Sequence, residues 1–231
     1  MIRFRVRSLH SRLRSRPSCC IGLVLLLLAS ACSTPVPPPR IDNLPMYGQP
    51  EIPRPTQLKQ ADEAFVVNAA SEFGGDRRLA AIAWTDQADR YFAEGNLDLA
   101  MRRYNQAWLL DPTSYEVFLG FGRVMLAQQR YDSAVAQLRR SLQLCDEAAA
   151  LPAILSDLGV AYSRQADAIK GLPSTRAATF ALANESFAGS TSNAPDNPET
   201  WRRWARSLSA EGKPADAAEK LRRADAAARA R

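Results

Sequence analysis

The sequence predicts an all-α fold made of helical hairpins that repeat along the chain. Between Trp84 and Pro112, apolar and small residues fall at steps of three and four, which places them on one face of a helix. Gly95 and Asn96 interrupt this spacing, so the stretch is expected to form two short antiparallel helices. The same pattern returns later in the chain, which indicates an array of hairpins rather than a single one.

The second copy follows the first at a period of 34 residues. Six positions recur in register: Trp84 and Phe118, Ala88 and Gly122, Tyr91 and Met125, Ala100 and Ala134, Tyr104 and Leu138, and Ala107 and Ser141. A single match to so degenerate a pattern would be weak, but six matches in register are a strong indication of a true repeat.

The third copy is longer than the first two. Gly159 and Ala183 are 24 positions apart, where Ala88 and Ala100 are 12 apart, so about 12 residues are inserted. The insert contains the sequence Gly-Leu-Pro at 171–173, which predicts a break or a lengthened loop. A fourth copy follows, marked by Trp201, Ala205, Leu208, Gly212, Ala217, Leu221 and Ala224.

These residues resemble the tetratricopeptide repeat, whose second helix carries the pattern A-x3-[FY]-x2-A followed by proline. The resemblance implies an α-solenoid of about four repeats, at residues 81–114, 115–148, 152–197 and 198–231. Stacked hairpins share one core, so small residues are expected where neighbouring helices cross closely, at Ala88, Gly122, Gly159 and Ala205.

Residues 1–31 have the composition of a secretory signal. Six arginines and no acidic residue occur in this segment, and an apolar run of eleven residues at 21–31 ends it. Such a run is far shorter than the ~20 residues that a membrane-spanning helix needs. We therefore expect a signal peptide that is removed.

Cys32 follows this run in the sequence LLASAC, which resembles the bacterial lipobox. The resemblance implies cleavage before Cys32 and attachment of acyl chains such as palmitate to it, and Ser33 after the cysteine implies export to the outer membrane. Two or three acyl chains hold a protein firmly in a bilayer. Inner-membrane anchoring and a free periplasmic domain are the alternatives.

Loss of the signal peptide changes the charge of the chain. The six arginines leave with it, so 24 Lys+Arg face 24 Asp+Glu in the remainder, and the only histidine, His10, is lost as well. The pI of about 9.4 therefore belongs to the precursor and does not indicate nucleic-acid binding.

Two segments precede the repeats. Residues 32–55 comprise the acylated cysteine and a stretch with eight of the 15 prolines, which predicts a disordered, extended tether. At ~3.1 Å per residue its 23 residues after the cysteine could reach roughly 70 Å. Residues 56–80 predict an amphipathic helix that caps the first repeat, and residues 81–231 form the repeat domain.

The chemistry of a catalytic or metal site is not expected in the mature chain. Without histidine, Ser-His-Asp, Cys-His and His-ligated metal sites cannot form. Cys145 is the one cysteine left free, and it is either a small buried residue or the source of an intermolecular disulfide. We expect no cofactor, no metal, no small-molecule substrate and no enzymatic activity.

The resemblance further implies a groove, lined by the first helix of each repeat, that binds protein segments. The expected lining residues are Thr85, Asp89, Phe92, Leu119, Arg123, Leu126, Ser156, Val160, Arg164, Arg202 and Arg206. An arginine cluster of Arg202, Arg206 and Arg164 is expected to bind a carboxylate, or else to be a solvated face. The Lys/Asn carboxylate clamp of chaperone-binding family members is not reproduced.

These observations favour a membrane-anchored periplasmic adaptor for protein partners, without catalysis and without nucleic acid. One alternative is a lipoprotein of pilus assembly, type IV or Tad-type, or of secretin assembly. Another is a cell-wall-associated protein whose basic end binds peptidoglycan or its synthases. Binding to such a polymer would weaken steeply with ionic strength, whereas an apolar groove contact would not.

Overall fold

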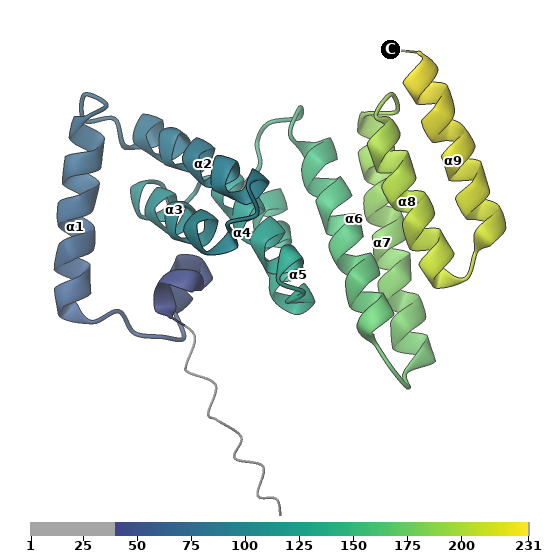
Figure 1. Ribbon diagram of the computed structural model, residues 1–231, viewed down its shortest axis with the longest axis horizontal. Coiled ribbons are helices and arrows are strands. Elements are labelled where there is room, and N and C mark those ends of the chain that lie inside the picture. Colours follow the sequence, from purple (N-terminus) through teal and green to yellow (C-terminus); the bar gives the residue numbers. More distant parts are fainter. Residues whose placement is uncertain (1–39, 231) are drawn as a thin grey trace, which may run out of the picture. The chain divides into compact units, whose positions relative to one another are not determined.

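Helices follow one another along the chain in a computed structural model of the protein, which describes residues 40–230 (Figure 1). These residues fall within one compact unit, 38–231. The described part holds nine α-helices and no strand: α1 (Thr56–Ser71), α2 (Arg77–Ala93), α3 (Leu97–Leu110), α4 (Tyr115–Ala127), α5 (Tyr131–Leu144), α6 (Leu151–Ala168), α7 (Pro173–Asn193), α8 (Pro198–Glu211) and α9 (Pro214–Arg229). The all-α prediction is confirmed for this part.

The last eight helices form four hairpins, in which α2 packs on α3, α4 on α5, α6 on α7 and α8 on α9. Each hairpin also packs on the next one along the chain. The predicted break between α2 and α3 is confirmed, because Gly95 adopts a left-handed φ of 77° and Asn96 caps α3 by accepting a hydrogen bond from the Leu99 amide.

Small residues lie where helices cross, as the sequence predicts. A Cβ atom on Gly122 would come within 2.5 Å of Leu138 Cγ, and one on Gly159 within 2.9 Å of the Phe187 ring. Tyr104, Leu138 and Phe187 hold equivalent positions on the second helices and are fully buried. In the second and third hairpins the repeat register therefore has a direct packing cause, which is one bulky side chain of the second helix over the backbone of the first.

Buried serines join the two helices of a hairpin through the backbone. Ser141 Oγ donates to the Tyr115 carbonyl at 2.8 Å, and Ser190 Oγ donates to the Pro152 carbonyl at 2.7 Å. The first copy has Ala107 at this position. A small residue is thus required there, and a serine satisfies its own hydroxyl by bonding to the first turn of the preceding helix.

The insertion in the third repeat lengthens helices rather than a loop. The predicted break at Gly171–Pro173 exists, but only residues 169–172 separate α6 from α7. The remaining inserted residues extend both helices, since α6 has 18 residues and α7 has 21, against 13 and 14 in α4 and α5. Alanine-rich sequence on both sides of the break explains this, because alanine favours the helix.

The disordered tether predicted for 32–55 does not describe residues 40–55, which are folded. Ile41–Asn43 (η1) and Pro45–Gly48 (η2) form short 3-10 helices that pack on α3. The proline count suggested chain that cannot pack, but Tyr47 and Asn105 supply a buried side chain and a buried hydrogen-bond partner. Residues 32–39 and the signal segment 1–31 lie outside the described residues.

α1 packs against α2 and α3. Phe65 meets Trp84 edge to face with ring centroids 5.2 Å apart, and Ala69 is buried beside Ala80 and Leu110. Residues 77–80, within the segment predicted to cap the array, belong to α2 instead. Asp76 starts α2 there by accepting hydrogen bonds from the Arg78 and Leu79 amides.

Candidate functional site

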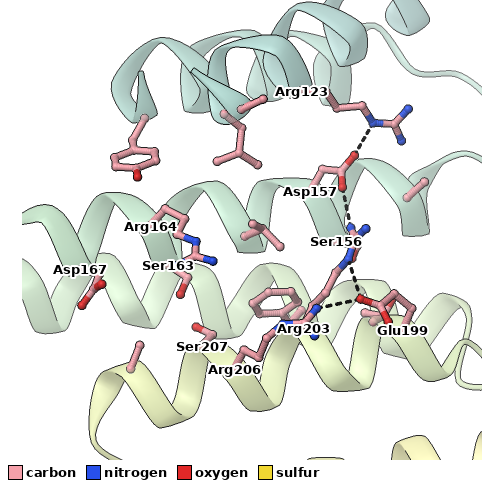
Figure 2. A pocket seen from close by; sticks show the side chains of 18 of the residues that line it. Arg123, Ser156, Asp157, Ser163, Arg164, Asp167, Glu199, Arg203, Arg206 and Ser207 are labelled. Carbon is pink, nitrogen blue, oxygen red and sulfur yellow. Dashed lines mark hydrogen bonds and ion pairs between the residues drawn. The ribbon is translucent and has the colours of Figure 1, made fainter. Parts of the chain in front are cut away.

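A cleft of about 1040 Å³ is lined mainly by α4, α6 and α8, the first helices of the second, third and fourth hairpins (Figure 2). Phe92 of α2, Tyr131 of α5 and Phe187 of α7 also reach it. Because hairpins stack in parallel order, the same face of each first helix is presented to the same side. Equivalent positions of successive repeats therefore form rows that run along the first helices, and members of these rows on α4, α6 and α8 line the cleft.

One row alternates in charge. Asp89, Arg123 and Asp157 follow one another at the repeat period of 34, and Arg203 comes 46 positions later, after the longer third copy. We call these four residues the charge ladder. Its members are acidic, basic, acidic and basic, so each repeat presents to the next a side chain of opposite sign.

Asp157 is the centre of the charge ladder and is only 7% exposed. Its Oδ2 lies 2.7 Å from Arg123 Nε, and its Oδ1 lies 2.7 Å from Arg203 Nη1 (Figure 2). Burial of Arg123 disfavours its charged form, but the charge of Asp157 and its hydrogen bond prevail and raise the pKa of Arg123 above its ordinary value. The ladder thus ties α4, α6 and α8 together.

The ladder continues at both ends. Tyr104 donates a short hydrogen bond to Asp89. The pKa of Tyr104 is raised, mainly by burial and secondly by this hydrogen bond. At the other end Arg203 Nε lies 3.5 Å from Glu199, which also accepts a hydrogen bond of 2.8 Å from Arg206. Burial of Glu199 acts in the opposite sense, yet these arginines lower the pKa of its carboxyl.

A second row beside the ladder is apolar. Phe92, Leu126 and Val160 follow one another at the period of 34, line the cleft and are half-buried. We call these three the apolar row. The next equivalent position, 46 residues on, is the exposed Arg206. The cleft therefore offers an apolar strip across three repeats that ends at a cation.

Polar groups gather where α6 and α8 face each other beyond the ladder (Figure 2). Ser207 lines the cleft, is 2% exposed, and its Oγ has no hydrogen-bond partner among the described residues. Arg164 is exposed and makes no ion pair or hydrogen bond within the described part of the chain. This end of the cleft retains unused donors, unlike the ladder.

The structure brings together part of the predicted groove. Of the expected lining residues, seven line the cleft: Phe92, Arg123, Leu126, Ser156, Val160, Arg164 and Arg206. Leu119 was expected to line it as well, but it is 9% exposed and packs in the main hydrophobic core. Leu119 is buried although it shares a helix face with Arg123, because α4 is packed among α2, α3, α5 and α6 and every residue of 117–122 is buried.

Three further expected residues do not line the cleft. Thr85 is buried and donates to the Ala81 carbonyl at 2.9 Å, Asp89 is exposed and bonded to Tyr104, and Arg202 lies 4.0 Å from Glu199. The expected arginine cluster is therefore not a free anion clamp. Arg202 and Arg206 share Glu199, and Arg164 alone of the three is unpaired in the described part.

Sequence reasoning missed Asp157 and Arg203. It placed Ser156 in the third copy and Arg202 in the fourth, which is one position before the residues equivalent to Arg123. Counting the period of 34 on from Arg123 would have reached Asp157 directly. The alternation of sign along that series was the available signal.

No group of three or more His, Cys, Asp or Glu residues in the described ranges is arranged to hold a metal ion. Cys145 is a half-buried free thiol whose Sγ donates to the Glu147 carbonyl at 3.3 Å. Within residues 40–230, none of the helices combines the length and the hydropathy that crossing a bilayer requires.

Comparison with known proteins supports the repeat. The model of the tetratricopeptide repeat family matches residues 91–151. Two crystal structures of MamA superpose with TM-scores of 0.50 and 0.51 at 15% identity, cover 77% and 74% of this chain, and are themselves covered to 97% and 85%. The pilF protein of Pseudomonas aeruginosa is similar over 74% of this chain and 78% of its own, with 17% identity and a TM-score of 0.48.

Among curated protein sequences, none matched this chain. At 15% identity the similarity to the MamA structures supports the fold and does not indicate a shared activity. The tetratricopeptide repeat is thus supported by sequence over residues 91–151 and by fold over the stacked hairpins of the described part.

Proposed function

We propose that this protein is a lipid-anchored adaptor, held at the outer membrane by acylated Cys32 and facing the periplasm, which binds a segment of a protein partner in the cleft without catalysing a reaction. The proposal that the cleft binds a partner is supported by the apolar row of Phe92, Leu126 and Val160. These three side chains line an open cleft and are half-buried. When a partner covers half-buried apolar side chains in a concave surface and removes them from water, the complex is stabilised.

The ion pairs of the charge ladder and of Glu199 restrict which charges the partner segment is expected to carry. Arg123 and Arg203 are engaged by Asp157, and Arg202 and Arg206 by Glu199. An acidic partner would have to displace these internal carboxylates, so the ladder does not favour one. The partner segment expected here is amphipathic, with apolar side chains on the apolar row and a hydrogen-bonding or carboxylate group near unpaired Arg164.

The anchor rests on the sequence. An arginine-rich start, a short apolar run and a lipobox-like LLASAC at 27–32 precede Cys32. A basic polymer-binding surface is not favoured after loss of the signal segment, since 24 Lys+Arg then face 24 Asp+Glu. Acyl chains would hold the chain at a membrane without a spanning helix.

Photo-crosslinking in living cells tests the binding part. A photoreactive residue replaces Leu126 or Arg164, which line the cleft, and in a matched control replaces Arg139, which is exposed on α5 away from it. Adducts are identified by mass spectrometry. We expect the same discrete protein from both cleft positions and not from position 139.

Adducts at the cleft that do not exceed those at position 139 would overturn the cleft as the working surface. A polymer-binding protein would instead give cell-wall adducts that disappear as ionic strength rises. Adducts only between copies of the chain would indicate self-association and likewise count against an adaptor.

A further inference from the structure

Residues 40–55, which we call the strap, are folded onto the first hairpin. Backbone amides of the strap donate to carbonyls within it, among them Asn43 to Arg40 at 2.9 Å and Ile52 to Gly48 at 2.9 Å. Met46 and Tyr47 adopt left-handed φ angles of 52° and 56°, which residues other than glycine seldom hold unless their surroundings fix them. The surroundings here are α3 and α1.

α3 holds the strap through one buried amide. Asn105 is 0% exposed; its Nδ2 donates to the carbonyls of Asp42 and Leu44 at 3.0 and 2.8 Å, and its Oδ1 accepts from the Tyr47 amide at 3.3 Å. Both donors and the acceptor of the side chain are thus used on strap backbone. The equivalent residue of the next repeat is the exposed Arg139, so this asparagine serves the strap and not the repeat.

α1 holds the other end of the strap through a shielded ion pair. Arg54 Nε and Nη2 donate to Asp62 at 2.6 and 2.7 Å, and the Arg54 side chain is 7% exposed. The guanidinium also lies 3.7 Å from the centre of the Tyr47 ring, and Tyr47 is 8% exposed. A bidentate pair of this kind fixes geometry as well as charge.

Held at both ends, the strap cannot act as free tether. We propose that the strap is a permanent part of the repeat domain and sets how far the first hairpin can move from the membrane. Only residues 33–39 then remain between Cys32 and the fold. At ~3.1 Å per residue these seven residues reach about 22 Å, against roughly 70 Å for the 23 residues up to residue 55. The distance rests on the lipid anchor proposed above.

The consequence concerns the partner. A protein held this closely meets partners that are embedded in the same membrane or lie against it, rather than partners bound to the opposite side of the periplasm. Asn105 is the positioning residue, because it holds the end of the strap that lies nearest Cys32, and release of that end lengthens the free chain. Arg54 holds the downstream end, and its release leaves residues 42–47 on α3.

Amide hydrogen exchange on the full chain tests the strap independently of any membrane. We expect the amides of Asn43, Tyr47 and Ile52 to exchange at least tenfold more slowly than in unfolded chain, and Asn105→Ala to abolish that protection while α4–α7 keep theirs. Arg54→Lys, which fits the same site without the bidentate pair, is the second variant should Asn105→Ala fail to fold. Asn193→Ala, at an exposed asparagine, is the control. Unprotected strap amides in the unaltered chain would overturn the proposal.

Energy transfer in vesicles tests the distance. The acylated chain carries Cys145→Ser and a donor dye on Asp86→Cys, an exposed position of α2. It is placed in vesicles of phosphatidylethanolamine and phosphatidylglycerol that carry an acceptor dye on the lipid headgroup. We expect transfer to fall at least twofold in Asn105→Ala. It should stay unchanged in Arg54→Lys, where Asn105 still holds residues 42–47, and in the control Asn193→Ala. Equal transfer in all variants would overturn the spacing. A chain that does not stay on the vesicles would refute the anchor as well, while the exchange result would still stand for the strap.

Discussion

Arg123 Nε lies 2.7 Å from Asp157 Oδ2, and the two residues occupy the same position in successive repeats. A repeat that placed one charge at this position in every copy would set like charges side by side on neighbouring helices. Alternation converts that repulsion into an ion pair, which Arg203 extends to the fourth repeat. The repeat period thus serves electrostatics as well as packing.

Asp157→Asn removes the charge that two arginines share and keeps the shape of the side chain. We expect the free energy of unfolding to fall by about 1–3 kcal/mol, less than for a fully buried pair, because Arg123 and Arg203 are each about one third exposed. Urea unfolding followed by circular dichroism measures this. Asp167→Asn, at a 54% exposed side chain 3.8 Å from Arg176, should change it by less than about 0.5 kcal/mol. Equal effects from both variants would argue against a special role for Asp157.

Gly159→Ala tests the close crossing of α6 and α7. The added methyl group would meet the Phe187 ring at 2.9 Å, and this ring is fully buried, so we expect a loss of about 1–3 kcal/mol. Gly189→Ala is the matched control within α7, because its methyl group meets only the tip of Leu155 at 3.3 Å and alanine favours the helix by up to about 1 kcal/mol. Thermal melting distinguishes the two. A neutral Gly159→Ala would mean that the helices are free to separate.

Tyr47 should ionise late. Burial, and then the neighbouring charge of Asp62, raise its pKa from 10.0 to about 12. Since the folded state holds the proton more tightly, this group contributes stability that is complete below pH 10 and is lost as the pH rises towards about 12. The difference in tyrosinate absorbance between the unaltered chain and Tyr47→Phe measures the titration. Ionisation of Tyr47 near pH 10 would show that the strap leaves the ring in water.

Val160→Asp places a charge in the middle of the apolar row. Because a partner segment would have to desolvate that carboxylate, we expect crosslinking from position 126 to fall at least tenfold, which corresponds to about 1.4 kcal/mol or more. Val67→Asp, at a 68% exposed valine of α1, is the matched control. Circular dichroism establishes that both variants are folded. Undiminished crosslinking in Val160→Asp would remove the apolar row from the binding surface.

Cys32→Ser tests the anchor. Serine cannot form the thioether to lipid, so we expect the protein to move from the membrane fraction to the soluble periplasmic fraction after cell lysis. Cys145→Ser, which removes the free thiol of the repeat domain, should leave the distribution unchanged. Retention of Cys32→Ser in the membrane fraction would refute acylation as the means of attachment.

The sequence by itself determined the hairpins and their register. Gly122 and Gly159 could be recognised because close helix crossings admit few residue types, and a period of 34 repeats that restriction along the chain. The local signals at Gly95 and Asn96 placed the turn, because a left-handed φ and a helix cap each depend on one or two residues.

Only the tertiary structure decided which side chains are free. The sequence predicted that Arg206 and Arg202 bind an anion, but in the structure both form ion pairs with Glu199. Residues 40–55 were predicted to be part of a disordered tether, but the side chain of Asn105, about 60 positions away, forms hydrogen bonds to their backbone. The two outcomes differ in kind. Glu199, Arg202 and Arg206 lie one and two turns apart on one face of α8, so helical spacing already allowed their ion pairs and the structure showed that they form. The contacts of Asn105 join residues distant in the chain, and composition and spacing do not report such a partner.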